Sequence, residues 1–204
     1  MRTLHPLCPA AFLAAAAIVT TIGCASAPPL TAEAQSSLRT VEESVNRVAA
    51  QFDRTSKALA AVRDDWDTDP DKSIRAFAME VGALESRVKE VGEPGSDLLL
   101  SRWDAQLRSI LNGELASAES SEDSAIQRAF EHADDRVASL REKFTPVYAR
   151  MLEFREDFRQ RSSGAEVESL LTELRRTTTD SKEVSKLFDQ LSQALSTLAG
   201  GKSR

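Results

Sequence analysis

The spacing of its apolar residues constrains this chain more than any other feature. From Leu38 onward these residues recur at steps that alternate between three and four, which keeps one face of a helix against its neighbours, as in a coiled coil. No window alternates apolar and polar residues with the period of two that a strand needs. The sequence therefore predicts an all-α fold. The longest run of this apolar seam comprises Ile126, Phe130, Ala133, Val137, Leu140, Phe144, Val147, Met151, Phe154 and Phe158.

Four long helices are expected, at residues 33–67, 70–112, 120–161 and 164–199. Their short connections favour antiparallel neighbours, and alanine and leucine residues beside the seam widen it beyond the stripe of a two-stranded coiled coil. We expect one domain over residues 33–199, an elongated up-down antiparallel four-helix bundle with coiled-coil-like packing. An elongated antiparallel coiled coil or an oligomer is the alternative.

Prolines and glycines indicate where these helices end or break. Asp69-Pro70 supplies a capping side chain followed by proline at the first helical position, and a glycine pair at 200–201 ends the last helix. Pro94-Gly95 interrupts the second helix where the seam loses phase, so we expect a hinge or a full break there. Pro146 falls where the seam continues, which predicts a kink rather than an end.

The N-terminus has the order of a secretory signal: Arg2, an apolar run over residues 10–22, and a small residue before Cys24. The run is too short to cross a bilayer, which takes about 20 helical residues. Ile22-Gly23-Cys24 resembles the lipobox of bacterial lipoproteins, and the resemblance implies cleavage before Cys24 and lipidation of that residue. Plain secretion is the alternative.

This interpretation divides the ends of the chain into short segments. Residues 1–23 are expected to be the signal peptide, 24–32 a tether and 200–204 a disordered tail. Ala25, rather than aspartate, follows the cysteine, as in lipoproteins that are sorted to the outer membrane. We therefore expect the protein in the envelope of a two-membrane bacterium, held by its lipid to the periplasmic face of the outer membrane.

Composition excludes several classes of function. The formal net charge is −6, and an acidic chain without a basic block does not favour nucleic-acid binding. After loss of the signal, the chain keeps His132 as its single histidine and Cys24, bound to lipid, as its single cysteine. These residues provide neither a nucleophile–base pair nor a histidine–cysteine zinc site. We expect a non-enzymatic protein with no catalytic residues and no cofactor.

An acidic segment joins the end of the first expected helix to the start of the second and offers a weak metal candidate. Its alternating carboxylates match the start of a calcium-binding helical loop. The match fails at Pro70, where the loop needs glycine, and at Ala76, where it needs glutamate. A hydrated turn that stops the helix explains these residues better. The four candidate ligands are Asp65, Asp67, Asp69 and Asp71.

Three segments, at 77–85, 102–107 and 144–149, resemble an uncharacterised bacterial family of helical lipoproteins that carries a domain of unknown function. The likeness runs from Phe77 to Val167, and this sequence departs from the family by shortening the region around Pro94. The resemblance implies a long helical hairpin or bundle. It implies no known activity and supplies no catalytic residues.

Two functions follow as hypotheses. The first is a lipid-anchored structural or protein-interaction module that binds an envelope protein through its tips or an open face. The second is a bundle that binds a small ligand or a lipid, with the break at Pro94-Gly95 opening the core. Tight apolar seams leave little room for the cavity that the second hypothesis requires. The sequence does not identify the partner.

Overall fold

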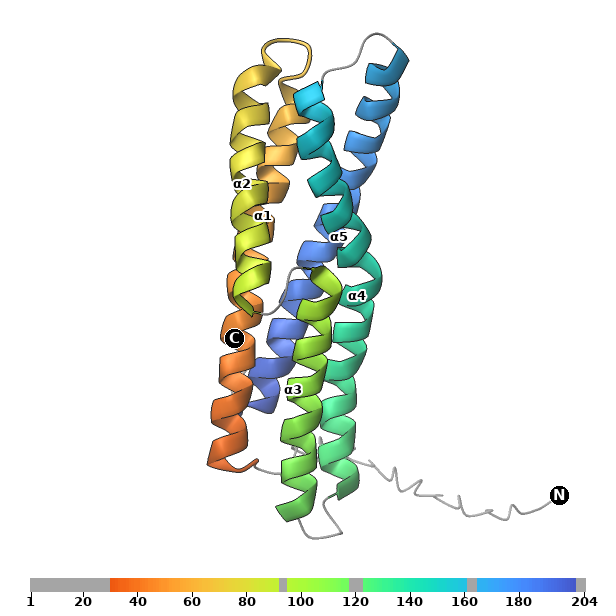
Figure 1. Cartoon of the computed structure of the whole chain (residues 1–204). Helices are drawn as coiled ribbons and strands as arrows, with labels where there is room; N and C mark the ends of the chain where they lie inside the picture. The colour runs from red at the N-terminus through yellow and green to blue at the C-terminus, as the bar shows by residue number, and fades with distance from the viewer. Residues whose placement is uncertain (1–29, 92–94, 118–122, 161–164, 201–204) are drawn as a thin grey trace, which may run out of the picture.

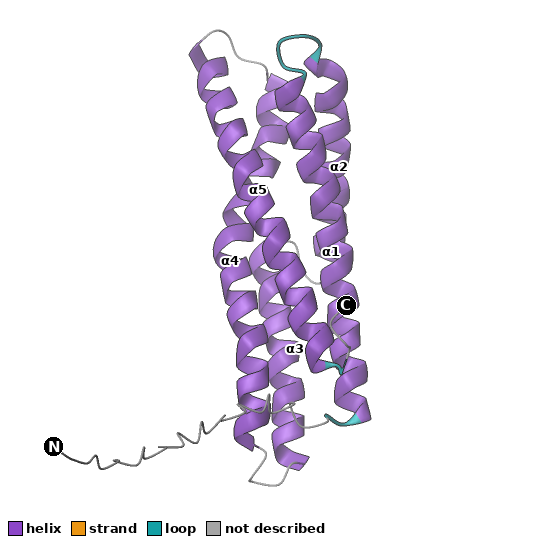
Figure 2. Cartoon of the chain, turned by 180° about the vertical axis from the view of Figure 1, so that it is seen from behind, coloured by secondary structure: helices purple, strands orange, loops and turns teal. Residues whose placement is uncertain are grey.

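The computed structural model describes residues 30–91, 95–117, 123–160 and 165–200. Helices make up nearly all of these residues and none of them lies in a strand, so the predicted all-α class is confirmed (Figure 2). The helices pack against one another into an elongated body (Figure 1). In chain order they are α1 (Ala32–Asp64), α2 (Pro70–Val91), α3 (Ser96–Ser117), α4 (Asp123–Gln160) and α5 (Ala165–Leu198).

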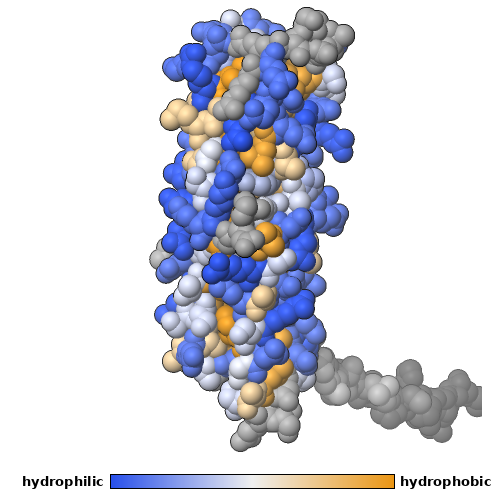
Figure 3. All heavy atoms as spheres, viewed as in Figure 1, coloured by the Kyte–Doolittle hydropathy of each residue, from blue (hydrophilic) through white to orange (hydrophobic). Residues whose placement is uncertain are grey.

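Several predicted features lie outside the described residues. They are the signal peptide at 1–23, Cys24, the tether as far as residue 29, Pro94 and residues 201–204. Within the described ranges, no helix has an apolar stretch of the length that a bilayer span takes. Hydrophilic residues cover most of the face seen in Figure 3, and the hydrophobic areas on it are small and separate.

Local side chains explain where α1 ends and α2 begins. The Asp65 N–H still donates to Ala61 O at 2.9 Å, and the Thr68 N–H then closes a turn onto Asp65 O at 3.0 Å. α1 thus ends before the predicted residue 67, because aspartate carboxylates oppose the negative end of the helix dipole. Asp69 Oδ1 accepts the Asp71 N–H at 3.4 Å, and α2 begins at Pro70 as predicted.

The last helix ends at a glycine, also as predicted. Gly200 has a φ of 77°, a left-handed conformation that favours glycine, and its N–H donates to Thr197 O at 3.1 Å. These contacts satisfy part of the C-terminal turn of α5.

The helix expected at 70–112 is two helices. α2 ends at Val91, and α3 begins at Ser96 and runs to Ser117, beyond the expected end. Gly95 has a φ of 146°, which favours glycine, and its carbonyl accepts the Leu99 N–H at 3.2 Å. In Figure 1 the first turn of α3 lies at the level of the last turn of α2, and the two helices touch. The break therefore offsets the start of α3 laterally from the end of α2.

This displacement changes the main packing partner. α2 packs chiefly against α1, whereas α3 packs chiefly against α4. α5 packs against both α1 and α4. Smaller contacts join α1 to α3 and α2 to α4, so the two short helices together occupy one position beside the three long ones.

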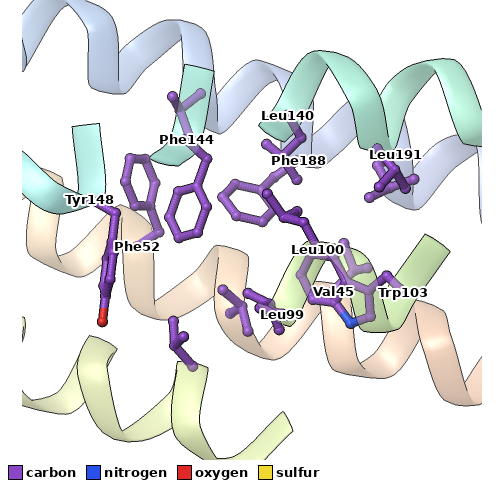
Figure 4. Close-up of a cluster of buried hydrophobic side chains, with 14 of the residues drawn as sticks. Val45, Phe52, Leu99, Leu100, Trp103, Leu140, Phe144, Tyr148, Phe188 and Leu191 are labelled. Atoms are coloured by element: carbon purple, nitrogen blue, oxygen red, sulfur yellow. The ribbon is translucent and has the colours of Figure 1, made fainter. Parts of the chain in front are cut away.

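The apolar seam forms the core. Every residue of its longest run is at most 5% exposed. Near the middle of the body, the ring centroid of Phe144 lies 5.5 Å from that of Phe52 and 5.3 Å from that of Phe188 (Figure 4). Trp103 joins this group with its ring 6.5 Å from Phe188. Each such buried side chain stabilises the fold by about 1.5–3 kcal/mol.

A second aromatic group lies near the α1–α2 turn. The ring of Phe158 is 5.9 Å from Trp66, 5.8 Å from Phe77 and 5.6 Å from Phe154. Both tryptophans therefore pack with the core. Trp103 is fully buried, whereas Trp66 is partly buried.

Candidate interaction groove

An open groove of about 470 Å³ lies between α4 and α5. Its lining combines acidic and basic side chains from both helices with apolar surface. The residues that line it are Glu142, Lys143, Pro146, Val147, Arg150, Glu173, Arg176, Thr177, Asp180 and Glu183.

Two local irregularities face each other at this groove. On α4, Pro146 lacks the N–H that would bond to the preceding turn. On α5, the buried positions between Leu174 and Val184 hold small polar side chains instead of large apolar ones. The Thr178 hydroxyl donates to Leu174 O at 2.7 Å, and the Ser181 hydroxyl donates to Thr177 O at 2.7 Å. Because these side chains are small, they leave α4 without a bulky partner at this level.

Ion pairs border the groove. The Arg150 guanidinium bonds to Glu173 on α5, and on its own helix to Glu153 at 2.7 Å and Asp157 at 3.4 Å. It also lies 4.3 Å from the ring centroid of Phe154, within range of a cation–π contact. Arg150 is thus the main polar link between α4 and α5.

A longer ion pair stands at another part of the rim, where Lys143 Nζ lies 3.8 Å from Glu183 Oε1. Such exposed pairs each contribute about 0–1 kcal/mol. They matter more for the character of the groove than for stability, because they give its lining charges of both signs. The lining suits a polar partner better than an apolar molecule.

The four aspartates of the weak metal candidate lie in the α1–α2 turn and the first turn of α2. Asp69 is engaged in capping α2. Throughout the described part of the chain, no three histidine, cysteine or acidic side chains are grouped in a way that could hold a metal ion. The structure therefore does not bring Asp65, Asp67, Asp69 and Asp71 together as ligands.

Charged and phenolic groups meet where α2 faces α4. Lys89 and Arg155 each donate to the Glu85 carboxylate at 3.0 Å, and these hydrogen bonds lower the pKa of Glu85. Burial raises the pKa of Tyr148 to about 12, and the negative charge of Glu85 adds to this effect. Glu85 in turn raises the pKa of Arg155.

At the α3–α4 contact, the pKa of one carboxyl shifts in the opposite direction from that of Glu85. Burial raises the pKa of Asp134, and the nearby charge of Asp104 raises it further. Asp104 itself accepts a hydrogen bond from Arg108 at 3.0 Å. His132 is exposed on α4 and lines no part of the groove.

Buried polar residues on α1 link it to both short helices. Ser44 Oγ accepts the indole N–H of Trp103 at 3.1 Å. Gln51 Nε2 donates to the Glu80 carboxylate at 2.7 Å, and the Thr55 hydroxyl donates to Glu80 O at 3.1 Å. These contacts determine how α1 is positioned along α2 and α3.

Neither the groove nor these buried links is among the features predicted from the sequence. The absence of large apolar residues between Leu174 and Val184 was a visible signal for the groove. Buried serine, threonine and glutamine at seam positions carried no comparable signal, because their partners are distant in sequence.

Comparisons with known protein families, curated proteins and solved structures found no match to this chain. The fold and groove by themselves define an elongated all-helical protein with a charged groove between two of its long helices.

Proposed function

We propose that this protein is a lipid-anchored, non-enzymatic interaction module of the bacterial envelope, on the periplasmic face of the outer membrane. In this proposal its helices form an up-down antiparallel bundle with coiled-coil-like packing, and α2 and α3 share one of the four positions. The sequence resemblance to helical lipoproteins agrees with the proposal.

Polar contacts between α3 and α4 support the antiparallel arrangement. Thr145 on α4 donates to Asp97 on α3 at 3.0 Å, and one helical turn away Arg141 donates to Ser101 at 3.4 Å. The residue numbers rise along α3 as they fall along α4. Buried seam residues on both sides of these contacts favour coiled-coil-like packing.

The observation that carries the proposal is the short sequence distance between Cys24 and the first residues that the structure describes. Leu30 is buried, and Thr31 contacts Glu114 at the end of α3. Residues 25–29 can span at most about 18 Å, so a lipid on Cys24 would hold this end of the body close to the membrane. α1 is 33 residues long, and its far end would then stand about 50 Å away.

The groove between α4 and α5 is the proposed partner surface. It is open, and its charged lining can form hydrogen bonds and ion pairs with a polar protein segment. The charges on this lining favour a polar segment over the alternative of an apolar cargo. No cofactor is required for this function.

Lipidation is tested by mass spectrometry of the N-terminal peptide from membranes of the native host. The proposal predicts a diacylated or triacylated peptide that begins at Cys24, and loss of membrane attachment in Cys24→Ser. Cys8→Ser is the matched control, because Cys8 lies in the expected signal peptide, and it should leave attachment unchanged. A soluble chain with an unmodified cysteine would contradict the proposal.

The partner surface is tested with a photo-crosslinking residue in intact cells. We place it at Asp180 or Glu183 in the groove and, as a control, at the exposed Glu43 on α1. The proposal predicts a discrete protein adduct from the groove positions only, which charge reversal of Arg176 weakens. Identical adducts from Glu43 would contradict it.

A further inference from the structure

Glu114 is an unusual residue for its position. It lies in the last turn of α3, where its negative charge opposes the helix dipole, and it is only 6% exposed. Burying a carboxylate costs free energy unless hydrogen bonds compensate. Local helix stability therefore does not explain why a glutamate occupies this position.

The compensating donors come from a residue 83 positions earlier in the sequence. The Thr31 N–H donates to Glu114 Oε2 at 3.1 Å, and the Thr31 hydroxyl donates to Glu114 Oε1. Thr31 thus donates a hydrogen bond to each oxygen of the Glu114 carboxylate. Charge-assisted hydrogen bonds of this kind are about twice as strong as neutral ones.

Thr31 is also the residue that starts α1. Its hydroxyl oxygen accepts the Ala34 N–H at 3.2 Å, which caps the helix. Gln35 Nε2 donates to Leu30 O at 2.9 Å, and both Leu30 and Ala34 are buried. The first turn of α1 is therefore tied to the end of α3 by the same group that caps it.

We propose that Glu114 acts as a clamp that joins the start of the folded body to the α3–α4 hairpin. The clamp fixes the point from which the N-terminal segment leaves the body. A displacement of that segment is then transmitted to two further helices instead of unwinding α1 from its first turn. The statement that this segment leads to a membrane rests on the function proposed above, whereas the clamp itself does not.

Hydrogen exchange on the full chain tests the clamp, with Glu114→Gln as the variant. The glutamine side chain replaces one acceptor oxygen of the carboxylate by an amide donor. This donor then faces the N–H and the hydroxyl of Thr31, which are donors as well. We expect amides at residues 34–38 to exchange about tenfold faster or more, and amides at residues 48–62 to keep their rates. Glu131→Gln, at an exposed position on α4, is the matched control and should change neither region.

Unchanged exchange at 34–38 would overturn the clamp. So would a uniform increase along all of α1, since that result describes general stability rather than a local joint. If Glu114→Gln does not fold, Glu114→Asp gives the same test and leaves the cap of α1 in place. The shorter side chain withdraws the carboxylate from Thr31 and should also speed exchange at 34–38.

The same measurements on Cys24→Ser in solution separate the clamp from the proposed function. The clamp predicts the same contrast between the two regions with and without a lipid. A failure of lipidation appears in the mass of the N-terminal peptide, whereas a failure of the clamp appears only in the exchange rates.

Discussion

α2 and α3 are short helices that follow one another in the chain, yet different contacts hold them in place. α2 packs chiefly on α1, and its polar link to α4 is the ion pair of Glu85 with Arg155, whose side chains are 30% and 22% exposed. α3 packs chiefly on α4, and it reaches α1 through the indole of Trp103 and the carboxylate of Glu114, both of which are buried.

The comparison indicates that the two ends of the body differ in how strictly their helices are positioned. Buried hydrogen bonds leave their partners unsatisfied when a helix shifts, which is costly, whereas a partly exposed ion pair can exchange with water at little cost. We therefore expect α3 to be held more rigidly against α1 than α2 is held against α4.

The largest effect is predicted for a variant that breaks a contact between α3 and α1. Trp103→Ala removes a fully buried side chain and leaves the Ser44 hydroxyl without the indole, so it should lower the free energy of unfolding by about 3–5 kcal/mol. Urea denaturation measures the change. Met79→Ala on α2 is the control, because Met79 is 76% exposed, and it should change stability by less than about 0.5 kcal/mol.

The break between the two helices gives the next effect. Gly95→Ala forces a side chain into a φ of 146° and should destabilise by about 1–3 kcal/mol. Gly82→Ala, inside α2, meets no atom within 4 Å and should stabilise by about 0.5–1 kcal/mol. Thermal unfolding of both variants compares them. Equal signs would show that the chain does not turn at Gly95.

Tyr148 allows a direct test of the α2–α4 contact. It is the chain's single tyrosine, so tyrosinate absorbance reports this residue alone. The phenol should titrate near 12 when folded and near 10 when unfolded. Because the folded pKa is raised, stability should be lost as the pH rises from 10 through 12. A folded chain whose tyrosine titrates near 10 would show that α4 does not bury it.

The smallest effects concern two carboxyls at the contacts of α4, namely Glu85 on α2 and Asp134 on α4 where it meets α3. The lowered pKa of Glu85 stabilises the fold above the ordinary pKa of a glutamate, and this contribution is lost as the pH falls through the folded pKa. The raised pKa of Asp134 works in the opposite direction, so its contribution is lost as the pH rises.

Amide variants should therefore differ in sign at neutral pH. Glu85→Gln should destabilise by up to about 1 kcal/mol, and Asp134→Asn should be neutral or stabilise by a similar amount. Urea denaturation across the acid range measures both. The same sign for both variants would contradict the assignment of these two environments.

Much of the helical structure could be predicted from the sequence, because seam spacing and capping residues act locally. The seam run from Ile126 to Phe158 is buried as predicted, and α2 begins at Pro70 as predicted. The break at Gly95 was also visible, since the seam loses phase there. The up-down arrangement, the lipid on Cys24 and the envelope address stay predictions.

The change of partner at the break could not be predicted. A loss of phase shows that a helix stops, but the direction of the next helix depends on side chains elsewhere. Trp103 contacts Ser44 only once the chain has folded, and the same holds for the contact of Glu114 with Thr31. The polar run between Leu174 and Val184 was visible in the sequence, but its position opposite Pro146 was not, because the two segments lie far apart in sequence.

The central claim is that α2 and α3 share one position in the body but have different main partners. A short thiol-specific crosslinker tests it on a Cys8→Ser, Cys24→Ser background. Gln51→Cys with Glu80→Cys joins α1 to α2, where the native side chains are 2.7 Å apart. Asp97→Cys with Thr145→Cys joins α3 to α4, where they are 3.0 Å apart.

Asp97→Cys with Glu153→Cys is the control, because position 153 lies about 12 Å farther along α4. Efficient linking of the first two pairs, with little linking of the control, is the result that this arrangement predicts. Failure of either pair, or a control that links as well as Asp97→Cys with Thr145→Cys, would contradict it.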